Sequence, residues 1–413
     1  MAVGLLLCVF LATRAVGGWL ADHPERYRAG GTTVTGDTEL YERWANQITR
    51  EGRTAYGEVT IEYPPGALPF MVAPLAESEG HSYRSRFVVL MVVVDAVGLA
   101  GLMVIARRSR SWWGPWAWTL LVPMLGPIAY LRLDLVPAVA TIWALERAQA
   151  GGWFGAGGWL GFGAVAKIYP GLLVPLLLAA RWRWRWRIVA GAAGVAALGL
   201  LPFVTSASGL WDSVAGYHTG RGLQVESTWG GLLLLGGHLG HPVQVVFDHG
   251  AFNSVGGGAG ILKSLSLALS LTALAFGTWL AAKRVRPDSM ADLATVMFGT
   301  LALLLAAGTV FSPQFMIWLS ALGAVAAGVA GRAVCVPLVL LGAANVLSQL
   351  VFPFHYDGLL ANHAAPLAVV VVRNLLVPAI GLLVLGRLCL AGRTPSDEPR
   401  PQPETAAVAT PSR

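Results

Sequence analysis

Long, mainly apolar runs recur along this chain and limit what it can fold into. Residues 87–105 and 188–204 are two of them, and each approaches the roughly 20 residues that a helix needs to cross a bilayer. Charged residues make up only 12% of the 413 residues, about half the share usual for soluble globular proteins. So few charged residues cannot cover the surface of a water-soluble protein of this length, and we therefore exclude a soluble enzyme. The sequence predicts an all-α, polytopic membrane protein.

Basic clusters between the apolar runs indicate the orientation of the chain. Cytoplasmic loops are enriched in Lys and Arg, and we assign three clusters to the cytoplasm, at residues 107–110, 181–187 and 283–286. An even number of crossings must then separate successive clusters. We expect about twelve transmembrane helices with both termini inside, near residues 2–21, 86–106, 112–131, 133–149, 152–166, 168–180, 188–206, 260–282, 290–310, 314–331, 333–352 and 364–390. Residues 1–390 form one transmembrane domain, and 391–413 a disordered cytoplasmic tail.

The net charge of +7 does not indicate nucleic-acid binding, because the basic residues lie in these short clusters. The Trp/Arg alternation at 181–187 is better explained by interfacial Trp anchors and by Arg contacts with lipid headgroups. The three cysteines, Cys8, Cys335 and Cys389, lie in apolar runs and predict neither a disulfide framework nor a metal site. We expect the lipid bilayer as a partner, and no nucleic acid.

The first large outer loop, residues 22–85, holds ten of the 22 acidic residues. Residues 37–50 within it carry an apolar stripe at helical spacing, formed by Leu40, Tyr41, Trp44, Ala45 and Ile48. One apolar face and one charged face predict a helix lying on the membrane surface. Residues 66–76 are apolar but too short to cross. We expect an outer loop built from two juxtamembrane helices.

Two of the expected spans, 152–166 and 168–180, are short and are divided at Lys167. They resemble half-helices that meet within the membrane, a geometry that is tolerated only around a lined cavity.

Charged residues at membrane depth are costly and are functional candidates by default. Six polar elements converge on the outer face in the expected topology. They are Asp37, Glu62, the pair Arg132 and Asp134, Lys167, the stretch 218–227 and the turn 312–314. An acid facing several bases beside lipid would suit an anionic, lipid-linked substrate that reacts outside the cytoplasm.

Each candidate also has a structural interpretation. Asp37 either caps its helix or, if Thr35 is the cap, is free to act as a base. Arg132 and Asp134 form a buried ion pair or bind phosphate. Lys167 snorkels to the surface or faces the cavity.

Three further candidates remain open in the same way. Glu62 fixes its loop or binds substrate, and residues 217–227 form either a solvated loop or part of a site. Arg373 lies in the middle of the last span and needs a partner that the sequence does not identify.

Six short motifs, taken in order, resemble those of the GT-C membrane glycosyltransferases, and most closely glycosyltransferase family 87, the DUF2029 group of mannosyltransferases. They lie at residues 36–45 (GDTELYERWA), 61–66 (IEYPPG), 132–135 (RLDL), 167–170 (KIYP), 217–227 and 312–315 (SPQF). Each motif is short, and their joint order and spacing carry the resemblance.

The resemblance implies a GT-C-like bundle and an enzyme without a cofactor, which moves a sugar, commonly mannose, from a polyprenyl-phosphate donor to a glycolipid or glycan acceptor. Transfer would invert the anomeric centre at the outer face of the cell membrane. Asp37 would be the general base on the acceptor hydroxyl. Many GT-C enzymes carry an acidic pair here, whereas Asp37 is followed by Thr38, so we expect no metal.

The remaining site residues follow from the same resemblance. Arg132, Lys167 and Arg221 would hold the phosphate of the donor, assisted by His218. Substrate binding is also expected of Glu62, Tyr63, Gln224, Glu226 and Gln314.

A transporter or lipid flippase for a lipid-linked anion is the alternative, with the same charges lining a translocation path. Such proteins often contain internal repeats and polar residues facing both sides. The sequence shows no convincing repeat, and apart from the basic loops its polar residues concentrate outside, which favours the enzyme.

Overall fold

The computed structural model describes residues 2–27, 34–76, 80–216 and 220–390. The predicted tail at 391–413 lies outside the described residues. The larger helices are α1 (Ala2–Asp22), α2 (Gly36–Thr49), α4 (Tyr83–Ser109), α5 (Trp113–Leu121), α6 (Leu135–Gln149), α7 (Trp153–Ala166), α9 (Arg185–Leu200), α12 (Thr228–His238), α13 (Ala259–Arg284), α14 (Met290–Ala307), α15 (Met316–Ala330), α16 (Cys335–Gln349) and α18 (Ala364–Leu390). Shorter helices are α3 (Leu68–Val72), α8 (Val174–Ala180), α10 (Ala207–Trp211) and α17 (Tyr356–Leu360), with tight turns η2 (Pro65–Ala67), η4 (Pro123–Tyr130) and η5 (Tyr169–Leu173).

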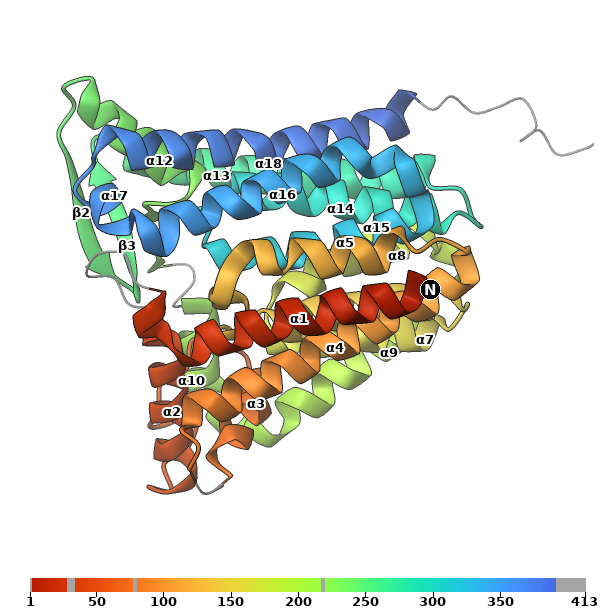
Figure 1. Ribbon diagram of the computed structural model, residues 1–413, viewed down its shortest axis with the longest axis horizontal. Helices are drawn as coiled ribbons and strands as arrows, with labels where there is room; N and C mark the ends of the chain where they lie inside the picture. The colour runs from red at the N-terminus through yellow and green to blue at the C-terminus, as the bar shows by residue number, and fades with distance from the viewer. Residues whose placement is uncertain (1, 28–33, 77–79, 217–219, 391–413) are drawn as a thin grey trace, which may run out of the picture.

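The long helices lie side by side, and the chain passes back and forth between the two ends of the bundle (Figure 1). Seven helical stretches in the described part of the chain are long and apolar enough to cross a membrane, and the bent pair of η4 and α6 would make eight. The protein is therefore a multi-pass, mostly helical membrane protein. Each of the twelve predicted ranges falls on helix, but some of these helices, such as α7 and α8, are too short to meet the length criterion. The count of twelve crossings stays a prediction.

The prediction of an all-α fold is wrong, because a small antiparallel sheet lies at one end of the bundle. Its strands are β1 (Leu223–Gln224), β2 (Val243–Asp248) and β3 (Ala251–Gly256), in the order β1-β3-β2. Asp248 pairs with Ala251, so that His249 and Gly250 form a two-residue turn, and both have positive φ. A turn of this kind matches the twist of a hairpin. The β-branched residues before it favour strand.

Helix α2 confirms the helix predicted in the outer loop, and Figure 1 shows it lying across the ends of the long helices. A helix lying on the membrane surface would turn its apolar stripe toward lipid. The stripe packs on the protein instead, so this part of the prediction is wrong. Tyr41 is fully buried and Trp44 is 6% exposed. The ring of Tyr41 lies 5.5 Å from that of Phe87 in α4 and 5.6 Å from that of Tyr63. The aromatic side chains thus fix the helix that begins with Asp37.

The two short helices predicted on either side of Lys167 are present as α7 and η5–α8. The chain reverses direction between them. As a result Trp153, at the start of α7, stacks on Trp184, just beyond α8, with ring centroids 6.4 Å apart. Lys167 therefore lies at the reversal of a helical hairpin.

A buried charged cluster fixes the chain just before the bend between η4 and α6. Asp95 of α4 is fully buried and accepts hydrogen bonds from Arg14 Nε (2.9 Å), Trp118 Nε1 (2.6 Å) and Tyr130 Oη (3.0 Å). A buried charge is retained only when it is paired and hydrogen-bonded. Because Tyr130 is the last residue of η4, the cluster holds the segment that carries Arg132 into place.

Candidate active site

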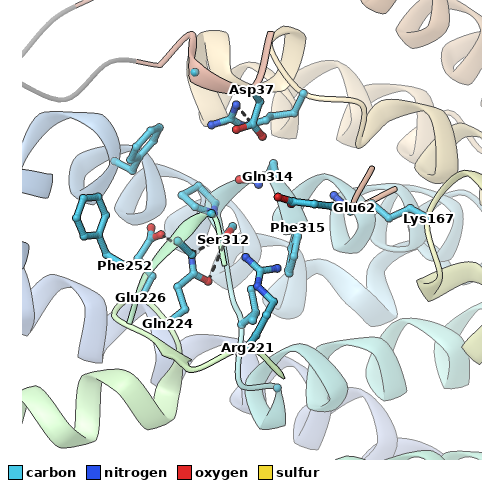
Figure 2. Close-up of a pocket in the computed structure, with 18 of the residues that line it drawn as sticks. Asp37, Glu62, Lys167, Arg221, Gln224, Glu226, Phe252, Ser312, Gln314 and Phe315 are labelled. Atoms are coloured by element: carbon cyan, nitrogen blue, oxygen red, sulfur yellow. Dashed lines mark hydrogen bonds and ion pairs between the residues drawn. The ribbon is translucent and has the colours of Figure 1, made fainter. Parts of the chain in front are cut away.

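A cavity of about 860 Å³ lies at the end of the bundle that carries α2 and the sheet. Nine of the ten predicted site residues line it. They are Asp37, Glu62, Tyr63, Arg132, Lys167, Arg221, Gln224, Glu226 and Gln314. The tenth, His218, lies outside the described residues. The nine come from segments far apart in the sequence, and Figure 2 shows Asp37 and Arg221 on opposite walls.

Asp37 lies in the first turn of α2, and Thr35 occupies the capping position. The Asp37 carboxylate instead forms an ion pair with Arg132, whose Nη1 lies 2.8 Å from Oδ2. The Asp37 side chain is one-third exposed and that of Arg132 is 9% exposed. The pair thus places a carboxylate on the wall of the cavity.

Lys167 reaches a second carboxylate, on the same bend as Arg132. Its Nζ lies 2.8 Å from Oδ1 of the fully buried Asp134, and Trp318 Nε1 donates to the same oxygen at 2.7 Å. The Lys167 ammonium also lies 5.1–5.2 Å from the ring centres of Tyr63, Phe315 and Trp318, within the range of cation–π attraction. Arg132 and Asp134, considered as a pair from the sequence, each bind a residue from a different element.

Tyr63 and Tyr41 form a hydroxyl–hydroxyl hydrogen bond of 2.8 Å beside Asp37. Burial raises the pKa of both phenols well above the usual value. Both side chains therefore stay neutral at physiological pH.

Gln224 and Glu226 belong to a second wall, formed by β1 and the turn after α14. The Gln224 amide accepts a hydrogen bond from the Phe311 backbone N–H (2.8 Å) and donates to Ser312 Oγ (2.8 Å) and to Glu226 Oε2 (3.0 Å). Burial raises the pKa of the Glu226 carboxyl to about 7, against the opposing effect of Arg373 and Arg132.

Arg373 of α18, which needed a partner, supports this wall from behind. Its Nη2 donates to the main-chain carbonyl of Glu226 at 2.6 Å, and its guanidinium lies 4.0 Å from the ring centre of Phe311. A charge in the middle of an apolar span indicated in the sequence that Arg373 needs a partner. The sequence could not show that this partner is a main-chain carbonyl.

Several lining residues were missed by sequence reasoning, among them Arg43, Phe252, Tyr356 and Asp357. Arg43 lies on α2, next to the apolar stripe. The other three come from the hairpin and α17, whose approach to the cavity had no signal in the sequence.

Within the described residues, no group of three or more His, Cys, Asp or Glu side chains could hold a metal ion. The expectation that the reaction needs no metal stays a prediction. The charged groups that are present allow a carboxylate to accept a proton and guanidinium groups to hold an anion in one cavity.

Comparison with known proteins gives one family match. The family model described as glycosyltransferase family 87 matches residues 61–250, which is less than half of the chain. No curated protein gives a significant sequence match. Two crystal structures of ArnT from Cupriavidus metallidurans, one bound to undecaprenyl phosphate and one in the apo state, are similar with 18% and 16% identity. The matches cover 93% of this chain and 78% and 77% of the ArnT chains, each with a TM-score of 0.48.

Proposed function

We propose that this protein is a membrane glycosyltransferase that moves a sugar from a polyprenyl-phosphate donor to a glycolipid or glycan acceptor. The observation that carries the proposal is the cavity itself, in which the Asp37 carboxylate faces the basic side chains of Arg132, Lys167 and Arg221. The match of residues 61–250 to a glycosyltransferase family supports the same reaction class.

The acidic and the basic side chains of the cavity have different roles in the proposed reaction. Asp37 accepts the proton of the acceptor hydroxyl, and the oxygen attacks the anomeric carbon of the donor sugar as the bond to the phosphate breaks. The phosphate leaves with the bonding electron pair, and Arg132, Lys167 and Arg221 stabilise its charge. One displacement inverts the anomeric centre.

The membrane setting supports a lipid-linked donor, because the cavity lies at one end of a bundle of apolar helices. The basic clusters lie toward the other end, so we place the cavity on the extracytoplasmic side. We propose mannose as the sugar, by the family resemblance of the motifs.

The test is transfer from radiolabelled polyprenyl-phosphate-mannose in membranes of a strain that lacks the protein, supplemented with purified wild type or variants. Asp37→Asn should lower transfer by about 100-fold or more in protein that still folds, because it removes the general base. Glu39→Gln, two residues along the same helix and hydrogen-bonded to Thr35, is the matched control and should transfer normally.

Normal transfer by folded Asp37→Asn would refute the proposed base. Uptake of the labelled lipid without turnover by wild type would indicate a transporter instead.

A further inference from the structure

The cavity wall across from Asp37 carries a buried carboxyl group with an unused oxygen (Figure 2). Glu226 is 3% exposed, yet it lines the cavity. Its Oε2 accepts the hydrogen bond from Gln224, whereas its Oε1 has no hydrogen-bond partner among the residues that the structure describes. Buried polar atoms in native proteins are nearly always paired, so such an atom calls for a partner from outside the chain.

Gln224 positions Glu226 rather than competing for a ligand. Both hydrogens of its amide are engaged, one by Glu226 and one by Ser312, and its oxygen accepts from the Phe311 backbone. The amide therefore has no free donor to offer and fixes the plane of the neighbouring carboxyl group.

The backbone around Glu226 is fixed from three sides. Arg373 and Asn374 donate to its carbonyl oxygen at 2.6 and 3.1 Å, and the preceding residue, Val225, donates its N–H to the carbonyl of Phe252 at 3.0 Å. This rigidity suits a binding group whose geometry is set before the ligand arrives.

The Glu226 carboxyl group disfavours a phosphate at its own position and favours a hydroxyl group. A carboxyl oxygen repels a phosphate when ionised, but it accepts a hydrogen bond from a hydroxyl, and when protonated it donates one. The phosphate is attracted to Arg132, which lies close enough to act electrostatically on both Asp37 and Glu226. A sugar joined to that phosphate would then extend between the two carboxyl groups.

We infer that Glu226 binds a hydroxyl group of the donor sugar and is a specificity-determining residue of the transfer reaction. This inference rests on the proposed function, since it requires a sugar-bearing donor in the cavity.

The test compares two ligands that differ only in the sugar, polyprenyl phosphate and polyprenyl-phosphate-mannose, binding to the full chain in lipid nanodiscs. Glu226→Ala should weaken binding of the mannose-bearing lipid by about tenfold or more, the usual effect of losing a hydrogen bond to a charged group. Binding of polyprenyl phosphate should be unchanged. Glu58→Ala, an exposed position in the outer loop, is the control and should bind both lipids as wild type does.

Monodeoxy-mannose donors provide a second measurement that does not depend on the alanine variant folding. Wild type should lose affinity for one deoxy donor, and Glu226→Gln, which keeps the shape of the side chain, should discriminate less between that donor and mannose. Equal weakening of both lipids by Glu226→Ala, or no deoxy donor that wild type distinguishes, would overturn the inference. Failure of wild type to bind or use any polyprenyl-phosphate donor would overturn the proposed function instead.

Discussion

Lys167 shows how a single residue can be stabilised within an apolar bundle and still line a cavity. Its charge is paired with Asp134 and surrounded by three aromatic rings, so its partner carboxylate offsets much of its field. Arg221 and Arg132 reach the cavity from other elements. All three basic side chains line the same space.

Glu226 gives a prediction for pH dependence at the same scale. Its pKa is raised to about 7 in the folded protein by burial, whereas the ordinary value is about 4.3. A raised pKa means that the contribution of Glu226 to stability is complete below the ordinary pKa and is lost as the pH rises through the folded value. Arg132, Arg373 and Tyr356 are the charged or titratable groups that act on it.

The difference in unfolding free energy, wild type minus Glu226→Gln, should therefore fall by about a few kcal/mol between pH 4 and pH 7. Above about pH 7 the difference should stay constant. Denaturant unfolding in detergent across this range measures the difference, in which the other titrations cancel. A flat difference would show that the folded carboxyl titrates normally.

Single residues also show how far the sequence could lead. Arg132 and Lys167 were identifiable because charge in an apolar context is costly and is retained for a reason. The roles of Asp37 and Glu226 followed from the resemblance of their motifs to a known family. The pairing of these charges was not identifiable. Arg132 and Asp134 are two residues apart, but the bend sends one toward α2 and the other toward α7, and only the fold determines this.

At the scale of elements, α7 and α9 pack through glycines. Gly157 and Gly161, four residues apart on α7, lie directly against the backbone carbonyls of Ile188 and Ala192, so that a Cβ at either position would clash. Small residues at this spacing allow membrane helices to approach closely. The contact holds α7, and therefore Lys167 at its end.

Gly161→Ala should therefore lower the unfolding temperature by several degrees, because the added methyl group meets backbone that cannot move aside. Gly194→Ala on α9 is the matched control. A Cβ there meets nothing within 4 Å, and replacing Gly in a helix favours folding by up to about 1 kcal/mol. Thermal unfolding in the same detergent compares them, and equal values for the two variants would contradict this packing.

The elements that were predicted and the one that was missed differ in their signals. The long helices follow from apolar length, and α2 follows from its stripe. The sheet was missed because residues 243–256 lie among apolar runs of similar composition, where short strands resemble helix segments. The lipid-facing orientation of α2 was wrong because amphipathicity indicates one apolar face but does not say whether lipid or protein covers it.

At the scale of the whole molecule, the two ends of the bundle differ in chemistry. The N-terminus and the end of α18 lie at the end away from α2 and the sheet (Figure 1). The basic loops meet there too, because Arg181 donates to the main-chain carbonyls of Arg286 and Ser289 at 3.3 and 3.1 Å. This separation supports the predicted orientation with the cavity outside.

Single cysteines placed at Glu58, near the cavity end, and at Lys283, in a basic cluster, test that orientation in a background with the three native cysteines replaced by serine. A membrane-impermeant maleimide should label position 58 in intact spheroplasts and position 283 only after permeabilisation. The reverse pattern would place the cavity in the cytoplasm and contradict the use of an external lipid-linked donor.

The contact between Arg132 and Asp37 has a consequence for the order of events. One guanidinium serves both the carboxylate on α2 and any phosphate that enters beside it, so the two anions compete. While Arg132 holds it, one oxygen of the carboxylate is engaged in the ion pair. That oxygen is released toward the acceptor only when a phosphate has drawn the guanidinium away. We therefore expect compulsory-order kinetics in which the donor binds first, so that neither water nor acceptor is activated before a donor is in place.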